Sequence, residues 1–419
     1  MENTVHETAR TDLPRREDGT IDLNAAACAL LEDSLNALMD EQASELAEAT
    51  GTQRNGYRER SLDTCAGTIT LRVPKLRRGT YFPDDVVARW SRTDTALASA
   101  VCDLWSLGLS TRKVEAVAGD LGVESMSRSR VSRLCAELDG EVSELGSRDL
   151  SYSAFPYLWL DATYCPCRDA GAARSTGLAV AVACDGGARR RVVGLGRIDT
   201  ESYVSWRDFL LSLRRRGLAG VRLVVSDAHE GLARAVREVL PGAAWQRCAA
   251  HLMRNVGERC RRKGDGAAAV AALRAAFSER DPALVRAGYR RAVELLSARD
   301  PRGAGLLEEA EPFATAYLAF PPEHARWLRT NNVVERLNRE IKRRTDSVGV
   351  FPSPESFERL GGAVCVDQDE AWLTAAHFID ARSLARPLEA PPSPEPSEEE
   401  VGGVLAAVEE AFERRLRAA

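Results

Sequence analysis

We predict an α/β fold for this chain from three features of its sequence. An apolar, aromatic run, Tyr157-Leu-Trp-Leu-Asp161, follows Phe155-Pro156 and has the composition of a buried strand. A second such run, Val221-Arg-Leu-Val-Val-Ser226, also ends on an aspartate, Asp227. Segments with helical periodicity lie before, between and after these strands. The two aspartates point to a divalent-cation site, because a buried carboxylate is costly unless it is paired or binds a metal ion.

The 419-residue chain has the composition of a soluble protein with several domains: 44% of its residues are hydrophobic and 28% are charged. No apolar run is long enough to cross a bilayer, and the start, Met1-Glu-Asn-Thr, lacks the basic and apolar regions of a signal peptide. We therefore expect a cytoplasmic protein without a membrane partner. The ten cysteines include no pair of CxxC motifs, which favours buried thiols over disulfides or a zinc ribbon.

The net charge of −5 is unevenly distributed along the chain. Residues 1–50 contain twelve acids and three arginines, and residues 387–419 contain eight acids and three arginines. Residues 51–386 therefore carry a net charge of +9. This basic body is compatible with a polyanionic partner such as nucleic acid.

The first 92 residues predict two small elements. Residues 1–50 form an acidic N-terminal segment with a helix over about 23–48, which we expect to pack on its own domain; a partner helix or a dimer contact is the alternative. Residues 51–92 form a small basic β element, because period-two alternation flanks the turn signal Asn55-Gly56. Its basic side chains suit either a phosphate-tracking surface or an ordinary solvated face.

Residues 93–150 are helical and resemble a helix-turn-helix DNA-binding region. Ser110 can cap a first helix, Gly119 and Gly122 bracket the turn, and Ser127 can cap a second helix that continues to Val142. The first turn of such a second helix reaches DNA bases or phosphates, whereas a generic helical hairpin would have no such role. The residues expected to contact DNA here are Arg112, Lys113, Ser127, Arg128 and Arg130.

Residues 151–260 alternate between strands and helices. The expected strands are 157–164, 177–184, 191–198, 221–226 and 243–247, and the expected helices are 202–216, 229–239 and one starting near Cys248. Three consecutive strands, a helix and a fourth strand match the order of a ribonuclease-H-like core. In that order the first and fourth strands are neighbours, so Asp161 and Asp227 would converge.

The remaining third of the chain is predicted to be largely helical. Residues 261–325 form a helical insertion, residues 326–386 complete the core, and residues 387–419 comprise a Pro-rich linker and a terminal helix at about 399–417.

A third carboxylate is expected from the helix at 331–345. Its apolar residues Val334, Leu337 and Ile341 are spaced to form a buried stripe, and Glu335 lies on the adjacent face. A solvated charged helix is the alternative, and Glu340, about 140° around the helix, is the weaker ligand candidate. Three carboxylates suit Mg²⁺ (or Mn²⁺) and metal-assisted phosphoryl chemistry. The residues of this helix expected to contact DNA are Arg336, Asn338, Arg339, Lys342 and Arg343.

Several ordered motifs resemble the mutator-type transposases of bacterial insertion sequences. These motifs are Arg54-Asn-Gly-Tyr-Arg58, Ser110-Thr-Arg-Lys-Val114, Val131-Ser-Arg-Leu-Cys135, Leu158-Trp-Leu-Asp-Ala-Thr-Tyr164, Val225-Ser-Asp-Ala-His-Glu-Gly231, Trp245-Gln-Arg-Cys248 with His251, and the helix at 331–345. The resemblance covers roughly residues 50–380 and implies a DDE triad of Asp161, Asp227 and Glu335 on a ribonuclease-H-like core.

The same resemblance implies an activity and its partners. The protein would bind the terminal inverted repeats of its element, cut at the ends and join the freed 3′-hydroxyl to target DNA, acting with Mg²⁺ as a homo-oligomer. The family's Cys-x-x-His falls on Cys248 and His251. Two ligands are too few for a structural zinc site, so we expect a structural or DNA-proximal role for this pair and a structural one for Trp245.

Two other functions stay open from the sequence. One is a DNA-binding regulator that kept the helix-turn-helix but lost the chemistry; the other is a ribonuclease-H-like nuclease without strand transfer. A metal-dependent cleavage assay separates the first from a transposase, and products joined to target DNA separate the second.

Overall fold

The computed structural model describes residues 13–83, 93–123, 126–136, 138–169, 172–198, 202–386, 388–389 and 394–418. The chain divides into two compact units, Met1–Asp139 and Gly140–Ala419. The predicted mixed α/β class is confirmed: the described residues are mostly helical, and the second unit contains a mixed five-stranded sheet. Each described helix is too short or too polar to cross a membrane. The first twelve residues and part of the expected linker lie outside the described ranges.

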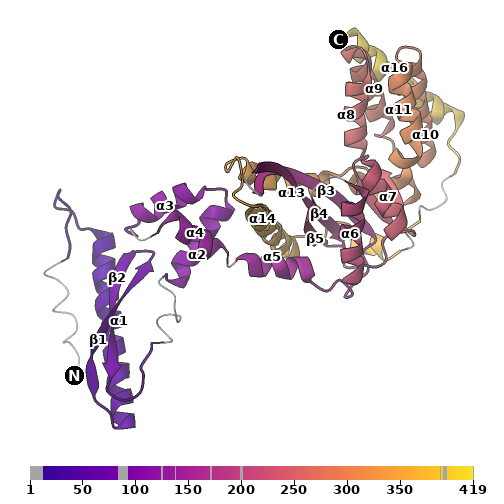
Figure 1. Ribbon diagram of the computed structural model, residues 1–419. Coiled ribbons are helices and arrows are strands. Elements are labelled where there is room, and N and C mark those ends of the chain that lie inside the picture. The colour runs from indigo at the N-terminus through magenta and orange to yellow at the C-terminus, as the bar shows by residue number, and fades with distance from the viewer. Residues whose placement is uncertain are drawn as a thin grey trace. The chain divides into compact units, whose positions relative to one another are not determined.

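The first unit begins with a long helix packed on a β-hairpin (Figure 1). The helix is α1 (Leu23–Thr50), and the hairpin strands are β1 (Arg54–Thr64) and β2 (Gly67–Leu76). Met39 of the helix packs with alternate hairpin residues, Leu62, Ile69, Leu71 and Val73. The N-terminal helix therefore packs within its own unit, as expected.

Three short helices complete the first unit: α2 (Thr95–Ser106), α3 (Thr111–Asp120) and α4 (Arg128–Cys135). Ser110 caps α3 by accepting a hydrogen bond from the N–H of Lys113, and Gly122 has a positive φ of 81° in the connection that follows. The second helix does not continue to Val142 as expected. It stops at Cys135. Helix α4 buries Val131 in the first unit, and a separate helix, α5 (Leu138–Ser147), follows and lies mostly in the second unit.

The second unit is built around a sheet with the strand order β5-β4-β3-β6-β7. The strands are β3 (Tyr157–Asp169), β4 (Ala172–Cys184), β5 (Arg190–Ile198), β6 (Leu223–Ser226) and β7 (Ala244–Arg247). The first three are antiparallel to one another, and β6 and β7 run parallel to β3. Strand β6 therefore lies beside β3, although the two are separated by more than fifty residues in the sequence.

Each face of this sheet is covered by helices (Figure 1). On one face, α6 (Tyr203–Arg215) and α7 (Glu230–Val239) form a core with Leu158, Leu160 and Val224. On the other face lie α13 (Asn332–Thr345) and α14 (Pro354–Thr374). Strand side chains alternate between faces, so the odd-numbered positions of β3 and β6 point toward α13.

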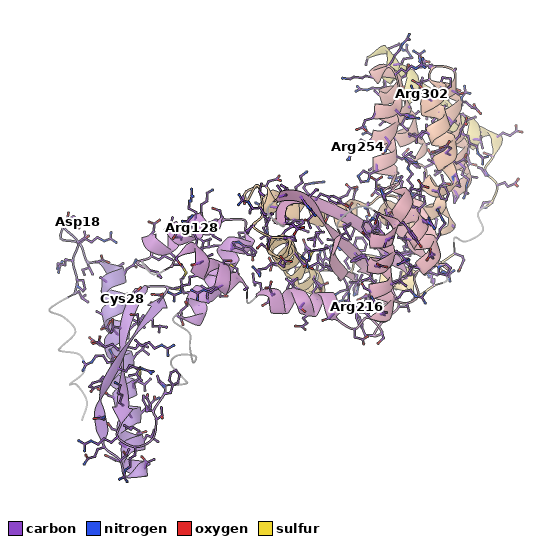
Figure 2. The ribbon with its side chains drawn as sticks, in the orientation of Figure 1. Asp18, Cys28, Arg128, Arg216, Arg254 and Arg302 are labelled. Carbon is purple, nitrogen blue, oxygen red and sulfur yellow. The ribbon has the colours of Figure 1, made fainter. Side chains whose placement is uncertain are left out.

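Helix α5 is attached to the sheet by Arg216, which follows α6 (Figure 2). Its guanidinium donates hydrogen bonds to the backbone oxygens of Leu145 (3.1 Å), Arg148 (2.8 Å) and Val193 (2.9 Å). Three carbonyls from α5, the segment after it and β5 thus share one cation, which fixes the start of the second unit against the sheet.

Helix α8 (Ala249–Arg259) is the expected helix near Cys248, and the segment 261–325, expected as a helical insertion, contains α9 (Lys263–Ala276), α10 (Pro282–Ser297) and α11 (Pro301–Ala314). The short helices η1 (Ala316–Ala319), η2 (Pro322–His324) and α12 (Ala325–Leu328) lead to α13, and α15 (Ala381–Leu384) follows α14. The terminal helix α16 (Glu398–Arg417) packs on α9 and α10, burying Val404, Val408 and Phe412.

The cysteines behave largely as predicted from the sequence. All ten are free thiols; eight are buried, Cys28 is half-buried and Cys65 is exposed.

Candidate active site

Two aspartates, Asp161 within β3 and Asp227 directly after β6, follow the segment over which these strands pair. Trp159 is paired with Val225 in the register of these parallel strands, and Asp161 and Asp227 each follow two residues later. Since side chains alternate, both aspartates point to the face of Trp159 and Val225, which α13 covers. Both are half-buried. Asp161 and Asp227 thus belong to neighbouring strands, as the sequence predicted, although β3 continues beyond Asp161 to Asp169.

Helix α13 supplies the third carboxylate. Val334, Leu337 and Ile341 form its buried stripe, as their spacing predicted. Glu335 lies half-buried in the first turn, and Asn338, one turn later, is buried beside Asp161.

Hydrogen bonds from Asn331 and Cys248 join the three elements that carry these carboxylates. Asn331 is the residue before the first turn of α13, and its side-chain amide donates to the carbonyl oxygen of Leu160 (2.9 Å), the residue before Asp161. The Asn331 N–H donates to Cys248 Sγ (3.2 Å), and the Cys248 N–H donates to the carbonyl oxygen of Ser226 (2.8 Å), the residue before Asp227. Asn331 and Cys248 therefore fix the start of α13 relative to β3 and β6 beside the two aspartates.

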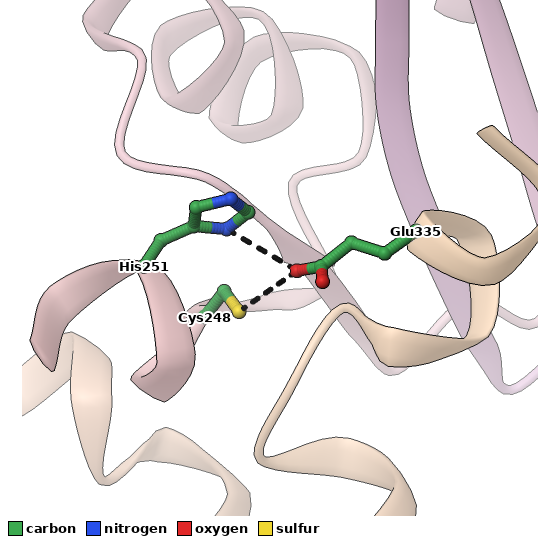
Figure 3. A group of neighbouring side chains, drawn as sticks. All are labelled: Cys248, His251 and Glu335. Carbon is green, nitrogen blue, oxygen red and sulfur yellow. Dashed lines mark hydrogen bonds and ion pairs between the residues drawn. The ribbon is translucent and has the colours of Figure 1, made fainter. Parts of the chain in front are cut away.

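Glu335 lies against two residues from the start of α8 (Figure 3). Its Oε1 is 3.8 Å from Cys248 Sγ and 3.5 Å from His251 Nδ1. One ligand atom from each of the three side chains lies within 4.8 Å of the others. Cys248 and His251, predicted to be structural, are thus direct neighbours of the proposed third ligand.

Asp161 has an unusual titration for an aspartate. Burial raises its pKa to about 6, and the negative charge of Glu335 adds to this rise. Asn338, the N–H of Ala162 and the charge of His251 act in the opposite direction. The Ala162 N–H donates to Asp161 Oδ1 at 3.0 Å. A cation beside Asp161 would reverse the effect of burial by favouring the ionised carboxylate.

Several buried polar atoms around these carboxylates have no hydrogen-bond partner. They are His251 Nδ1, Asn331 Oδ1 and Asn338 Oδ1. Such atoms are rare in native proteins because each one loses its interaction with water. A hydrated divalent cation would supply the partners, and the carboxylate and amide oxygens present are ligands that Mg²⁺ and Mn²⁺ prefer. The residues therefore fit such an ion.

Glu340 has a different environment from Glu335. It forms ion pairs with Arg343 (2.7 Å) and Arg344 (3.1 Å), and the hydrogen bond from Arg343 is the main cause of a pKa lowered to about 2. Glu340 is thus neutralised within its own helix. Arg343, which the sequence suggested as a DNA contact, is engaged in this pair.

Beside α13 lies an arginine-rich pocket of about 390 Å³ that sequence reasoning missed. Its lining residues are Arg190, Arg326, Trp327, Thr330, Asn332, Val333, Arg336, Arg339 and Phe378. Its lining includes no carboxylate, and within the described residues none of its four guanidinium groups has an acidic partner. Burial, and then the charge of Arg336, lower the pKa of Arg190. Only Arg336 and Arg339 were predicted, because the others come from separate segments.

Arg247 is another residue near the site that was not predicted from the sequence. It is buried at the end of β7, and its Nε has no hydrogen-bond partner. Burial lowers its pKa, while the nearby charge of Asp227 raises it. The sequence could have indicated this residue, because it is a polar residue at the end of a third expected strand. Trp245, two residues earlier, donates a hydrogen bond to Ser226 Oγ (2.9 Å) and packs on Phe313.

In the first unit, the predicted DNA contacts fall into two groups. Arg112, Lys113, Ser127 and Arg128 are exposed at the starts of α3 and α4. Figure 2 labels Arg128. Arg130 is different: it forms an ion pair with the buried Asp63 and donates to Thr93 Oγ1 (2.7 Å), and its side chain is only 14% exposed. In α13, Asn338 is buried while Arg339 and Lys342 are exposed.

Comparison with known proteins connects this arrangement to a family. The model of the "Transposase, Mutator family" matches residues 4–375. The chain is 36% identical over 364 residues to the transposase for insertion sequence element IS1081 of Mycobacterium tuberculosis, covering 87% of this chain and 88% of the relative.

Two further relatives are similar over comparable lengths. The transposase for ISRM5 of Rhizobium meliloti is 36% identical, with 85% and 89% of the two chains covered. The transposase for IS256 in transposon Tn4001 of Staphylococcus aureus is 32% identical, with 82% and 90% covered. The chain belongs to the mutator family of transposases.

Proposed function

We propose that this transposase binds the terminal inverted repeats of an insertion sequence and catalyses metal-dependent strand cleavage and strand transfer. Asp161, Asp227 and Glu335 are the proposed catalytic carboxylates, and Mg²⁺ or Mn²⁺ is the proposed cofactor. The core is proposed to be ribonuclease-H-like, which the strand order β5-β4-β3-β6-β7 supports. Helices α3 and α4 are proposed as the helix-turn-helix.

The observation that carries this proposal is the convergence of three distant segments. The proposal is supported by the pairing of Trp159 with Val225, two residues before Asp161 and Asp227, and by the charge of Glu335, which contributes to the raised pKa of Asp161. The hydrogen bonds of Asn331 and Cys248 hold the three elements together. A protein that only bound DNA would gain nothing from gathering acidic groups, because they repel phosphates.

In this proposal, each residue has a separate role at the site. Divalent cations held by Asp161, Asp227 and Glu335 would activate the attacking oxygen and stabilise the leaving oxygen. Asn338 would orient Asp161, since its amide already lowers the pKa of that carboxyl. Arg247 would limit the repulsion between Asp227 and its acidic neighbours, because it is the nearby cation.

The arginine-rich pocket is the proposed binding surface for the DNA backbone near the site. Arg336 and Arg339 lie on the same helix as Glu335, and Arg190 and Arg326 extend the positive surface from other segments. Four guanidinium groups without acidic partners repel one another, and phosphates relieve that repulsion. In the first unit, Arg112, Lys113, Ser127 and Arg128 remain the proposed contacts to the repeat sequence.

The proposed reaction requires both ends of an element to be held during cleavage and joining. We therefore propose a homo-oligomer that brings two inverted repeats together and then engages target DNA.

A cleavage and joining assay tests the proposed function. The substrate is a DNA fragment containing the sequences that flank the coding region, mixed with a circular target plasmid and Mg²⁺. We expect cuts at the ends and products joined to the plasmid, both absent in EDTA. Cuts without joined products would favour a nuclease, and binding without cuts in Mg²⁺ or Mn²⁺ would favour a DNA-binding regulator.

A further inference from the structure

Cys248 and His251 form a cluster with Glu335, one of the three proposed catalytic carboxylates. Unlike the all-oxygen set of those carboxylates, this cluster contains sulfur and nitrogen donors. The cluster offers a sulfur, an imidazole nitrogen and an oxygen, all within 4.8 Å of one another. The Sγ–Oε1 and Nδ1–Oε1 separations are 3.8 and 3.5 Å. Ligand atoms around a tetrahedral zinc ion lie about 3.3–3.6 Å apart. The two separations from Glu335 Oε1 are therefore within a few tenths of an ångström of those in a zinc site, and the third pair of atoms lies within 4.8 Å.

Cys248 occupies a position that favours a metal-bound thiolate. It precedes the first turn of α8 as its N-cap and is fully buried. The Asn331 N–H donates a hydrogen bond to its Sγ (3.2 Å). Hydrogen bonds of this kind stabilise a thiolate.

His251 directs toward Glu335 an imidazole nitrogen that has no hydrogen-bond partner. It lies three residues after Cys248, so the two side chains project from the first turn of α8 toward Glu335 (Figure 3). Its Nδ1 is buried and has no hydrogen-bond partner; its nearest acidic oxygen is Glu335 Oε1. A buried imidazole nitrogen without a partner is costly, and metal coordination would remove that cost.

We propose that Cys248, His251 and Glu335 bind a thiophilic divalent cation of the zinc class, with water as the fourth ligand. The proposal rests on the proposed function only in that Glu335 also serves the catalytic site. Binding forms a metal–sulfur bond and releases the thiol proton to solvent, with no change of oxidation state. Mg²⁺ is excluded because it prefers oxygen ligands, whereas Zn²⁺ and Co²⁺ accept thiolate and imidazole.

The shared glutamate gives this site a consequence for activity. While Glu335 is bound to a cation with Cys248 and His251, it is withdrawn from Asp161 and Asp227. A zinc-class cation should therefore inhibit Mg²⁺-dependent cleavage without displacing DNA.

The direct test is titration of the full-length, metal-free protein with Co²⁺, followed by absorption spectroscopy without DNA. We expect one equivalent to produce a sulfur-to-cobalt charge-transfer band and the strong visible bands of tetrahedral Co²⁺, both removed by Zn²⁺ and not by Mg²⁺. Cys248→Ser should abolish the charge-transfer band. His251→Ala and Glu335→Gln should each weaken binding at least tenfold.

Matched controls come from the same two helices. Cys260→Ser removes a thiol at the other end of α8, and Glu340→Gln removes a carboxylate on another face of α13; neither should change the titration. Circular dichroism establishes whether each variant is folded. If Cys248→Ser does not fold, the loss of Co²⁺ affinity in the His251 and Glu335 variants tests the proposed site instead. The absence of a charge-transfer band in the wild type, or its persistence in Cys248→Ser, would overturn the proposal.

The two proposals can fail separately. A wild type that cleaves DNA in Mg²⁺ but shows no cobalt–sulfur band keeps the proposed function and loses the zinc-class site. A wild type that shows the band but never cleaves DNA keeps the site and loses the proposed function.

Discussion

At the scale of single residues, Asp161 combines burial with nearby charges of both signs. Its pKa is raised from 3.8 to about 6, so the folded protein binds its proton more tightly than the unfolded chain. The associated stabilisation is complete below about pH 3.8 and is lost as the pH rises through about 6. In metal-free protein above pH 6, the ionised carboxylate therefore destabilises the fold.

Asp161→Asn removes this charge while preserving the shape of the side chain. In EDTA, we expect the variant to be more stable than the wild type at pH 8, by no more than about 3 kcal/mol, and to lose this advantage near pH 4. Urea unfolding across this pH range measures the difference. An advantage that does not change with pH would show that burial of the Asp161 charge is not its cause.

At the scale of elements, the ion pair between Arg130 and Asp63 connects α4 to β1. Asp63 is only 2% exposed, so removing the guanidinium leaves a buried carboxylate without its cation. The expected destabilisation of Arg130→Ala is about 3 kcal/mol. Arg128, two residues earlier, is 59% exposed and makes only a distant pair with Glu115, so Arg128→Ala should change stability by less than about 0.5 kcal/mol.

The two substitutions should affect DNA binding in the opposite order. Arg128→Ala should weaken binding to the terminal repeat and reduce its salt dependence while the protein stays fully folded. Chemical unfolding and gel-shift titrations at two salt concentrations measure both properties. Our assignment would be wrong if Arg130→Ala left stability unchanged and weakened DNA binding more than Arg128→Ala.

The terminal helix α16 makes a second prediction at this scale. Val408 is fully buried against α9 and α10, and Glu409 forms an ion pair with Arg291 (2.6 Å). Val408→Asp should destabilise the second unit by at least about 3 kcal/mol, because it buries an unpaired charge. The exposed Glu410→Ala is the control. Thermal unfolding should show a lower transition temperature for Val408→Asp alone; equal transitions would mean that α16 does not support the insertion.

At the scale of the whole molecule, the parts predicted best from the sequence were those determined by local patterns. The apolar runs that end at Asp161 and Asp227 gave both strands and their adjacency, and the stripe of Val334, Leu337 and Ile341 gave the orientation of α13. Local patterns gave a wrong prediction where the apolar residues of one expected helix pack in two different units. The apolar spacing continues past Cys135, but Val131 and Val142 belong to different units.

The remaining features depend on contacts between distant segments. The pocket joins Arg190 of β5, Arg326 of α12 and Phe378, which follows α14, and no sequence spacing relates them. Cys248 and His251 are close in sequence, but the third member of their cluster, Glu335, is more than eighty residues away. Only the folded structure shows that Cys248 and His251 form a group of three side chains with Glu335.

The central claim is that Glu335, and not Glu340, completes a catalytic site with Asp161 and Asp227. The most direct test compares Glu335→Gln with Glu340→Gln in DNA cleavage with Mg²⁺, with gel-shift titrations alongside. Glu335→Gln should lower cleavage roughly a thousand-fold, since it removes a charge that holds the cation, while DNA binding survives. Glu340→Gln only breaks ion pairs with Arg343 and Arg344 and should cleave within a few-fold of wild type. Normal cleavage by Glu335→Gln, or its loss in Glu340→Gln alone, would contradict the account.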